Sequence, residues 1–235
     1  MNTTFVMIDQ IQALAAVDTP TIANAMESLQ ITDRRFTGPQ IRPMTGASGP
    51  VVGIGVTATM KEQWGGKFAH LEPWLKFVDE IESCPLPVIA VFHDESEQAG
   101  RDAMIGEGMS RAMRAAGAAG VLCDGCIRDL AALREMSWAV WAGGSSADRG
   151  RIRFHRYQVP VEIAGMVVHP GDIIHADENG AVIVPADRVQ DILEAAAKVA
   201  ANEAKMFAMF SDPGFRVAQL YEFYAGRLTK GPLDQ

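Results

Sequence analysis

The sequence predicts a mixed α/β fold, and two changes of periodicity along the chain carry that prediction. Between residues 87 and 142, short apolar strands alternate with helical segments, which indicates parallel strands joined by right-handed crossovers. From Val159 the apolar residues recur with a period of two, which is typical of antiparallel strands and hairpins. At 235 residues, 48% hydrophobic and 21% charged, the chain is long enough to bury a full core.

The first half of the chain contains clear start and stop signals. Thr19 is the expected N-cap of a helix with Pro20 at its first position, and this helix should turn Ile22, Ala25, Met26 and Leu29 inward. The elements expected here are a helix from 19, a loop over 34–49, a strand over 51–60, a loop over 61–66, a helix over 68–82 and a strand over 87–92.

The second half begins with Gly106, Glu107 and Gly108, which should open a helix that ends near Gly117 or Gly120. Asn179-Gly180 between alternating segments predicts a hairpin. The elements expected after this first helix are a strand over 120–124, a helix over 127–136, a strand over 138–142, and strands near 159–164, 166–168, 172–176 and 181–184.

A long amphipathic helix should close the second half. Asp187 is its expected cap, with Gln190 three residues later, and it should run to about Phe210. Residues 211–214 break the pattern, and a short helix over 217–226 is expected to pack on a neighbouring subunit. We therefore expect a single domain over 1–235, with a core of about 18–210 and a C-terminal extension over 211–235.

Charge and hydropathy exclude several function classes. Lys and Arg number 21 against 29 Asp and Glu, a net charge of −8, which argues against a broad electrostatic grip on nucleic acid. A run of about 18 apolar residues is absent, so no membrane span is expected. The N-terminus lacks a basic region followed by an apolar stretch, so a cytoplasmic protein is the expectation.

The three cysteines do not suggest a disulfide framework, because their number is odd. Cys123 and Cys126 form a C-x-x-C pair, which is compatible with a redox pair or with half of a zinc site. The five histidines lie at no spacing that would supply the remaining zinc ligands. Two reduced, buried thiols are the simpler interpretation.

A candidate ligand site combines Glu107 with the pair Arg128 and Asp129. Each lies at the start of a helix that follows a strand, which is the edge of an α/β layer where ligands usually bind. Free N–H groups at a helix N-terminus bind carboxylate or phosphate, and an arginine adds a planar fork. Gly106 and Gly108 would let the backbone approach closely. Two carboxylates nearby could hold a hydrated divalent cation such as Mg²⁺.

The same residues have a second interpretation. Arg128 and Asp129 could be a charge pair at a helix start, and Glu107 could be a first-turn acid that the helix dipole favours. The residues alone leave both interpretations open.

The order and spacing of these residues resemble the RraA-like family. That family includes class II 4-hydroxy-4-methyl-2-oxoglutarate / 4-carboxy-4-hydroxy-2-oxoadipate aldolases and regulators of ribonuclease E. Gly106-Glu107 is followed, after twenty intervening residues, by Arg128-Asp129, with Asp124-Gly125 just upstream. The resemblance covers roughly 18–210, and its further motifs are GVTAT within 53–59, Val167 to Asp172, Ala176 to Gly180 and Val182 to Pro185.

The resemblance implies a three-layer ββα sandwich that assembles as a homotrimer or homohexamer with sites at subunit interfaces. It also implies that Asp129 is the direct ligand of Mg²⁺ or Mn²⁺ and that Glu107 holds metal-bound water. The backbone of Gly106, Glu107, Gly108 and Met109 would bind the substrate carboxylate, and Arg128 the keto oxygen. A neighbour's glutamate is expected to complete the site, with Glu203 as the candidate.

One segment departs from the family pattern. The family usually has a P-G-D-N-like turn after the early strand, with an asparagine near the substrate, whereas residues 61–66 here read KEQWGG. Trp64, His70 and Glu72 could reshape the pocket or simply pack in the loop. This departure bears on the substrate's identity more than on its pyruvyl end.

The function implied is a metal-dependent lyase that acts on a small anionic 2-oxo acid. It would cleave a 4-hydroxy-2-oxo acid through a pyruvate enolate, with a base relayed through Glu107, and oxaloacetate decarboxylation would be a natural side activity. The alternatives are a non-catalytic binding protein, as in the ribonuclease E regulators, and another metal-assisted reaction on a hydroxy or sugar acid.

Overall fold

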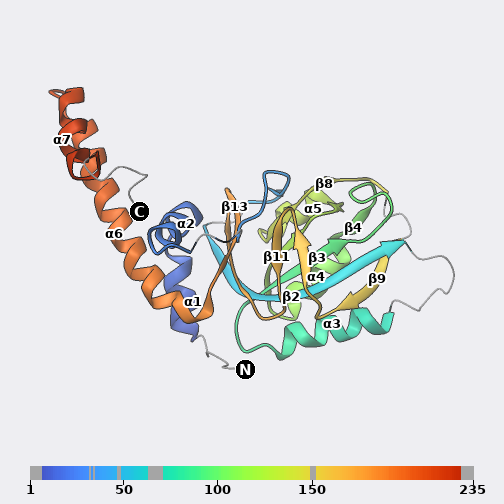
Figure 1. The fold of residues 1–235 in the computed structure, drawn as a ribbon. Coiled ribbons are helices and arrows are strands. Elements are labelled where there is room, and N and C mark those ends of the chain that lie inside the picture. The colour runs from blue at the N-terminus through green and yellow to red at the C-terminus, as the bar shows by residue number, and fades with distance from the viewer. Residues whose placement is uncertain are drawn as a thin grey trace.

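The fold is a three-layer α/β arrangement with a helical arm at the C-terminus (Figure 1). It was analysed as a computed structural model that describes residues 7–31, 33, 35–46, 49–62, 71–148 and 152–228. Trp64 and His70, which the sequence singled out, lie outside the described residues.

The central sheet is mixed, with a parallel centre and antiparallel flanks. Its strands, in spatial order, are β1 (Arg42–Pro43), β7 (Ala139–Ala142), β5 (Ala118–Cys123), β3 (Val88–Asp94), β2 (Val51–Glu62), β12 (Ile173–Asp177) and β13 (Gly180–Val184). The neighbours β7, β5, β3 and β2 pair in parallel, as the alternation over 87–142 predicts. The hairpin of β12 and β13 is antiparallel, and it turns at Glu178 and Asn179, one residue before the predicted Asn179-Gly180.

Strand β2 is long enough to belong to two parts of the sheet. One of its edges pairs with β3 over 54–60. Its other edge pairs first with β12, over 51–54, and then with β9 (Ile152–Tyr157), over 58–62. The sequence did not predict β9, whose residues carry four polar side chains in six positions.

The period of two in the strands separates the two faces of the sheet. Ile89 and Val91 of β3 pack against the hairpin of β10 (Val161–Ile163) and β11 (Met166–Val168). Ala90 and Phe92, which point the other way, pack in the core beneath α3 (Leu71–Ser83), α4 (Glu107–Ala115) and α5 (Leu130–Glu135). Helices, main sheet and hairpin are therefore the three layers.

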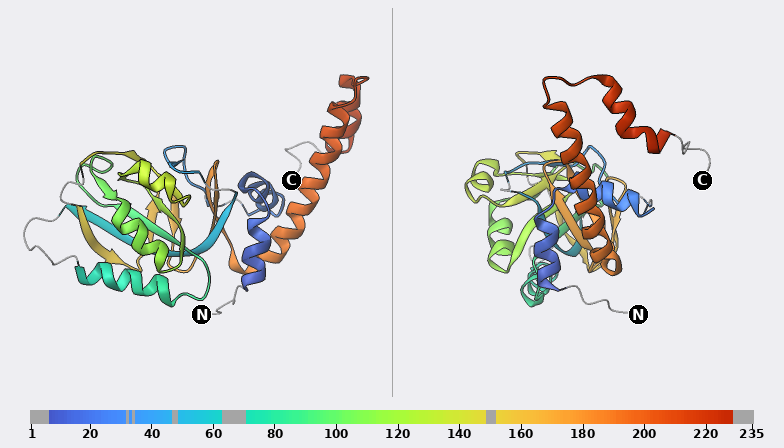
Figure 2. Two further views of the ribbon diagram at one scale, coloured as in Figure 1. Left: turned by 180° about the vertical axis from the view of Figure 1, so that it is seen from behind. Right: turned by 90° about the vertical axis from the view of Figure 1, so that its left-hand side faces the viewer.

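A third core joins the N-terminal helices to the arm. Helices α1 (Ile8–Ala15) and α2 (Thr19–Ser28) pack with α6 (Val189–Phe210) against β12 and β13. The buried residues of α6 all lie in its first eight positions. The rest of α6 projects away from the body and leads to α7 (Val217–Leu228) (Figure 2). No helix in the described part of the chain is long and apolar enough to cross a membrane.

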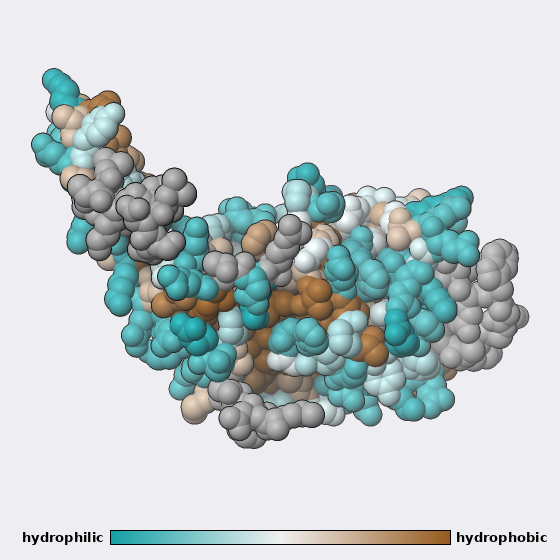
Figure 3. All heavy atoms as spheres, viewed as in Figure 1, coloured by the Kyte–Doolittle hydropathy of each residue, from teal (hydrophilic) through white to brown (hydrophobic). Residues whose placement is uncertain are grey.

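The arm carries apolar side chains that this chain leaves uncovered. Hydrophobic residues appear at the far end of the arm and in a band across the middle of the body (Figure 3). The large ones on the arm that are exposed are Phe207, Phe210, Val217, Tyr221 and Phe223. That the extension packs on another subunit stays a prediction.

Two predicted helix caps were wrong. Asp18, not Thr19, caps α2, because its Oδ1 accepts a hydrogen bond from the Thr21 N–H at 2.9 Å. Asp187 lies in a short 3₁₀ turn, and α6 begins at Val189 without a side-chain cap. In both places the sequence offered a plausible capping residue within one or two positions of the true boundary.

The predicted helix over 127–136 was also too long. Its first residue, Ile127, belongs to β6 (Cys126–Ile127), which pairs in parallel with β4 (Ala103–Ile105) and β8 (Gly144–Ser145) in a small second sheet. Helix α5 begins only at Leu130. These strands have two or three residues each, too few to show a period in the sequence.

Candidate functional site

The candidate site lies where two strand-to-helix turns meet, beyond the carboxyl ends of β4 and β6. Gly106 is the N-cap of α4, and Arg128 and Asp129 form the turn before α5. The Arg128 N–H donates to the Ile105 carbonyl at 2.9 Å, so the pairing of β4 with β6 continues into the turns. Segments that are twenty residues apart in sequence therefore lie side by side.

The carboxylate of Asp129 reaches from one turn to the other. Its Oδ2 accepts a hydrogen bond from the Glu107 N–H at 2.9 Å and lies 3.7 Å from Nε of Arg128. Asp129 precedes α5 but does not cap it with its side chain, and its backbone is left-handed, with φ 63°. That conformation is tolerated by Asp better than by most residues, and it is found often at functional sites.

Gly106 is required by space and not by its backbone angle. Its φ of −138° is ordinary extended backbone. A Cβ at this position would lie 2.6 Å from Oδ2 of Asp129 and 3.0 Å from Nε of Arg128. At Gly108, by contrast, a Cβ would meet no atom within 4 Å, so this part of the helix N-terminus is open.

Glu107 is paired with a residue that the sequence analysis missed. Nε of Arg111 donates to Oε1 of Glu107 at 2.7 Å, and both side chains are substantially exposed. The i,i+4 spacing of Glu and Arg on a predicted helix was the signal that could have identified this pair.

Of the four backbone amides expected to hold a substrate carboxylate, that of Glu107 is already used, because it donates to Asp129. The first turn of a helix has no internal acceptors for its amides, so those of Gly108 and Met109 are left for a ligand. Together with the positive end of the helix dipole they favour an anion.

Glu203 lies elsewhere in the chain. It lines a groove of about 410 Å³ between α2, α6 and α7, and none of Gly106, Glu107, Arg128 or Asp129 lines that groove. Within one chain, therefore, Glu203 and the candidate site are not brought together. A role for Glu203 in catalysis requires a second subunit and stays a prediction.

The donor set at Asp129 is compatible with a hydrated Mg²⁺ or Mn²⁺. Among the described residues, no three His, Cys, Asp or Glu side chains gather into a group that could hold a metal by themselves. The hydrogen bonds described for Asp129 use Oδ2, which leaves Oδ1 available. Mg²⁺ commonly uses one or two carboxylates and fills its other positions with water and substrate oxygens, so this half-exposed carboxylate fits.

The C-x-x-C pair has the properties of two buried thiols. Cys123 and Cys126 are both buried and neither forms a disulfide. Burial raises the pKa of Cys126, and it raises the pKa of Cys123 well above its usual range. Because redox exchange and zinc binding use the thiolate, this environment favours the simpler interpretation.

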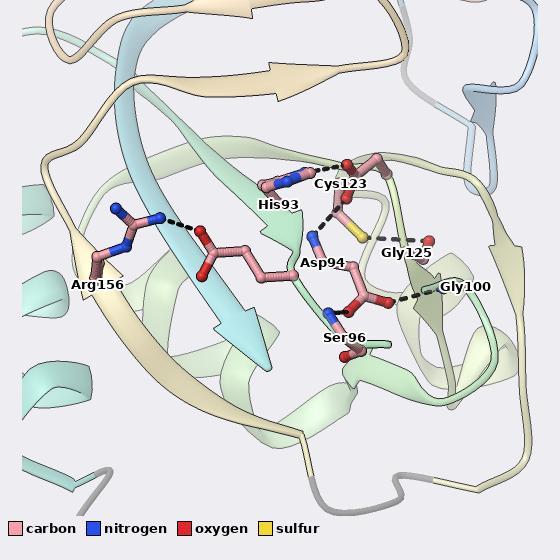
Figure 4. A network of polar contacts seen from close by, with 9 residues as sticks. His93, Asp94, Ser96, Gly100, Cys123, Gly125 and Arg156 are labelled. Carbon is pink, nitrogen blue, oxygen red and sulfur yellow. Dashed lines mark hydrogen bonds and ion pairs between the residues drawn. The ribbon is translucent and has the colours of Figure 1, made fainter. Parts of the chain in front are cut away.

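A polar network joins the chain segments that lead into the site (Figure 4). Nδ1 of His93 donates to Oδ2 of Asp124 at 2.5 Å, and Oδ1 of Asp124 accepts from the Asp94 N–H at 2.8 Å. Glu95 contacts both His155, at 2.7 Å, and Arg156. Sequence reasoning noted Asp124 only as part of a family motif and did not identify the network.

Comparison with known families gives a match over residues 19–183 to the RraA-like model, described as Aldolase/RraA. That segment contains both turns of the candidate site. The chain belongs to the RraA-like family. Its fold and the resemblance noted from the motifs are thus confirmed.

Curated relatives match this RraA-like chain over short segments. A proposed 4-hydroxy-4-methyl-2-oxoglutarate aldolase from Deinococcus radiodurans is 38% identical over 69 residues, which is 29% of this chain and 43% of that protein. Protein DlpA from Legionella pneumophila is 30% identical over 89 residues, 37% of this chain and 14% of DlpA. The chain thus spans less than half of the length of either relative.

Solved structures support the same fold. RraAS2 from Streptomyces coelicolor, described as an unusual member of the RNase ES inhibitor RraA protein family, aligns with a TM-score of 0.68 at 23% identity, over 86% of this chain and 96% of RraAS2. An uncharacterised protein from Pseudomonas syringae aligns with a TM-score of 0.70 at 21% identity, over 91% of this chain and 97% of its own. At these identities the likeness concerns the fold alone.

Proposed function

We propose that this RraA-like chain is a divalent-metal-dependent lyase that cleaves a 4-hydroxy-2-oxo acid to pyruvate and a second carbonyl compound. The observation that carries the proposal is the convergence of the Asp129 carboxylate, the Arg128 guanidinium and the open first turn of α4. Relatives named as proposed aldolases support the same reaction class. The same chemistry would allow oxaloacetate decarboxylation as a side activity.

The first turn of α4 would bind the substrate's carboxylate. The amides of Gly108 and Met109 have no internal acceptors, and Gly108 leaves their approach open. The guanidinium of Arg128 would face the keto oxygen, where its planar fork can accept the negative charge that develops there. Asp129 would hold the Mg²⁺ or Mn²⁺, whose chemistry when bound is the stabilisation of negative charge on the substrate's oxygens.

Glu107 would receive the proton of the C4 hydroxyl, directly or through one water. As that proton leaves, the C3–C4 bond breaks and its electron pair passes into the pyruvyl half, which becomes an enolate facing Arg128. The C4 half departs as the second carbonyl compound, and protonation at C3 yields pyruvate. Arg111, which donates to Glu107 at 2.7 Å, would keep this carboxylate oriented.

A second subunit would supply Glu203 to the site. The groove that Glu203 lines also contains Glu27 and no cationic side chain. Helix α4 carries Arg111 one turn beyond Glu107, and Arg114 and Arg134 lie in the last turns of α4 and α5. This charge complementarity and the uncovered apolar residues of the arm support a homotrimer or homohexamer with shared sites.

The test is a pyruvate-coupled assay over a panel of 4-hydroxy-2-oxo acids, with and without Mg²⁺ or Mn²⁺. Metal-dependent release of pyruvate from at least one of them is the expected result. Binding to ribonuclease E without pyruvate release would favour a regulator. Turnover of a hydroxy or sugar acid without pyruvate release would favour another metal-assisted reaction.

A further inference from the structure

The pair His93–Asp124 lies at the end of β5, and the short strand β6 connects it to the turn that carries Arg128 and Asp129. Strands β3 and β5 are parallel neighbours, with Phe92 opposite Cys123, so the residues that follow these two lie beside each other. His93 donates through Nδ1 to Asp124 at 2.5 Å, and both side chains are less than a third exposed. The pair is therefore formed at the end of the rigid part of the sheet.

Three hydrogen bonds hold Asp124 in place. Its Oδ2 bonds His93, its Oδ1 accepts the Asp94 N–H at 2.8 Å, and its own N–H donates to the Phe92 carbonyl at 3.3 Å. All three partners belong to β3. The side chain of Asp124 thus ties the start of the β5–β6 turn to the neighbouring strand.

The turn that follows has little room to move. A Cβ on Gly125 would overlap the side chain of Met104 and lie 3.2 Å from Oδ2 of Asp94. Gly143 donates to the Gly125 carbonyl at 3.1 Å, and a Cβ on Gly143 would overlap the Asp124 carbonyl. A displacement of Asp124 must therefore be passed on along the chain to β6.

The same network fixes the segment that leads to Gly106 and Glu107. The buried carboxylate of Asp94 accepts the N–H groups of Ser96, at 3.0 Å, and Gly100, at 2.8 Å. Sγ of Cys126 donates to the Gly100 carbonyl at 2.9 Å, which joins this loop to β6. The chain segments that lead to the two turns of the candidate site are thus held by one set of contacts.

We propose that His93 and Asp124 are positioning residues that hold the β5–β6 turn and thereby set the affinity of the Arg128–Asp129 corner for its ligands. The part of this proposal that concerns ligand affinity rests on the proposed function, because the affinity is measured with a divalent metal. The part that concerns the order of the β5–β6 turn does not depend on what the site binds.

The pair should make the corner sensitive to pH. The hydrogen bond from His93 to Asp124 raises the pKa of His93 above the usual 6.5, although burial lowers it. The nearby charges of Glu95 and Asp94 also raise this pKa. On the other side of β2, Arg156 pairs with Thr59, which is also the register partner of His93, and His155 precedes Arg156 on β9. The charged pair is complete below pH 6.5 and is lost as the pH rises through the raised pKa of His93.

Three variants and a matched control separate positioning from general stability. His93→Phe removes the donor, Asp124→Asn removes the acceptor charge, and His93→Asn restores a donor near the Nδ1 position but cannot titrate. The control, His155→Phe, makes the same change in the same network, at a residue whose partner is Glu95.

The measurements are amide hydrogen exchange over 125–130 and the Kd of Mn²⁺ from electron paramagnetic resonance, on the full chain at pH 6.0 and 8.5. We expect His93→Phe and Asp124→Asn to exchange faster over 125–130 and to raise the Kd at pH 6.0 about tenfold. His93→Asn should regain protection and lose the pH dependence, and His155→Phe should match the wild type.

Different results would overturn the positioning role and the metal assignment. Wild-type exchange over 125–130 in both His93→Phe and Asp124→Asn would overturn the proposal. So would faster exchange with an unchanged Kd, or a His155→Phe variant with the same defect. Failure of the wild type to bind Mn²⁺ at all would reject the metal assignment instead, and hydrogen exchange alone would then decide the positioning role.

Discussion

The main-chain N–H of Glu107 donates to Oδ2 of Asp129 at 2.9 Å, across 22 positions of sequence. This hydrogen bond joins the N-terminus of one helix to the turn before the next. It uses one amide of α4 to orient the carboxylate that we assign to the metal, and it leaves the amides of Gly108 and Met109 for an anion. The first turn of α4 and the Arg128–Asp129 turn are therefore coupled, and a substitution in one should displace groups in the other.

Gly106→Ala should inactivate the protein without unfolding it. The backbone angle at Gly106 suits alanine, but the added methyl would lie 2.6 Å from Oδ2 of Asp129 and displace that carboxylate. Misplacement of about 1 Å at a reacting group can lower turnover roughly a hundredfold. The measurements are metal-dependent pyruvate release and Tm. Gly108→Ala, where space is open, is the matched control for stability and should leave Tm unchanged or raise it.

Asp129→Asn should abolish metal-dependent turnover and raise the Kd for Mn²⁺ to the point where binding is no longer detected. Asparagine also tolerates the left-handed backbone at this position, so the substitution removes the charge with little strain. Circular dichroism and Tm should stay close to the wild type. Full activity at modest Mg²⁺ would reject Asp129 as the ligand, and Asp129→Ala should be equally inactive.

Arg128→Lys should lower turnover although the charge is kept. Lysine cannot present the planar fork that meets an enolate oxygen and its neighbour together. Loss of one preorganised donor costs about 3 kcal/mol of barrier, or about a hundredfold in rate. Oxalate, a planar dianion that resembles the pyruvate enolate, should inhibit the wild type competitively only with metal present, and its affinity should fall in parallel in the variant. Wild-type turnover in Arg128→Lys would contradict the enolate mechanism.

Glu203→Gln and Asp129→Asn should each be inactive alone and should recover activity when mixed. In a shared-site trimer or hexamer, subunit exchange combines an intact Glu203 from one chain with an intact Asp129 from another. The readout is pyruvate release after the two variants are unfolded and refolded together, compared with each refolded separately. Light scattering should give a trimer or hexamer, and a monomer at micromolar concentration would remove the proposed role of Glu203.

His175 should make the N-terminal helices sensitive to acid. It is fully buried, and its Nε2 donates to the carbonyls of Leu14, at 3.1 Å, and Val17, at 2.9 Å. Its Nδ1 lies 2.9 Å from the Thr19 hydroxyl, which can donate to the neutral ring. Burial lowers the pKa of His175 despite these carbonyls and the nearby carboxylates of Asp177 and Asp18.

Because the folded-state pKa lies below the usual 6.5, the unfolded chain binds the extra proton first as the pH falls. The contribution of His175 to stability is therefore present above pH 6.5 and is lost as the pH falls from there through the lowered pKa. Urea unfolding at several pH values measures the effect. His175→Gln should be less stable at neutral pH and should show a shallower decline below pH 6.5, whereas an unchanged slope would contradict the assignment.

The sequence by itself determined the parallel centre of the sheet, and it placed the candidate site residues at the starts of two helices. The apolar runs of β3 and β5 are long, and the helical pattern between them is regular. The residues that the local pattern predicts to be buried are therefore buried in the structure. Gly106, Glu107, Arg128 and Asp129 could be proposed because they place anion-binding and cation-binding groups at two helix starts, and the resemblance to the RraA-like family favoured this interpretation over a structural charge pair. Such features depend on residues close in sequence, where propensity and period are informative.

Only the tertiary structure decided how those residues meet. The left-handed backbone of Asp129, the hydrogen bond from Glu107 and the pair His93–Asp124 depend on strands that bring distant segments together. The short strands β4, β6 and β8 have too few residues to show a pattern, and β2 is shared between β12 and β9 because the sheet bends there, which no local signal encodes. Long-range pairing, and not the preference of any single residue, gives the candidate site its geometry.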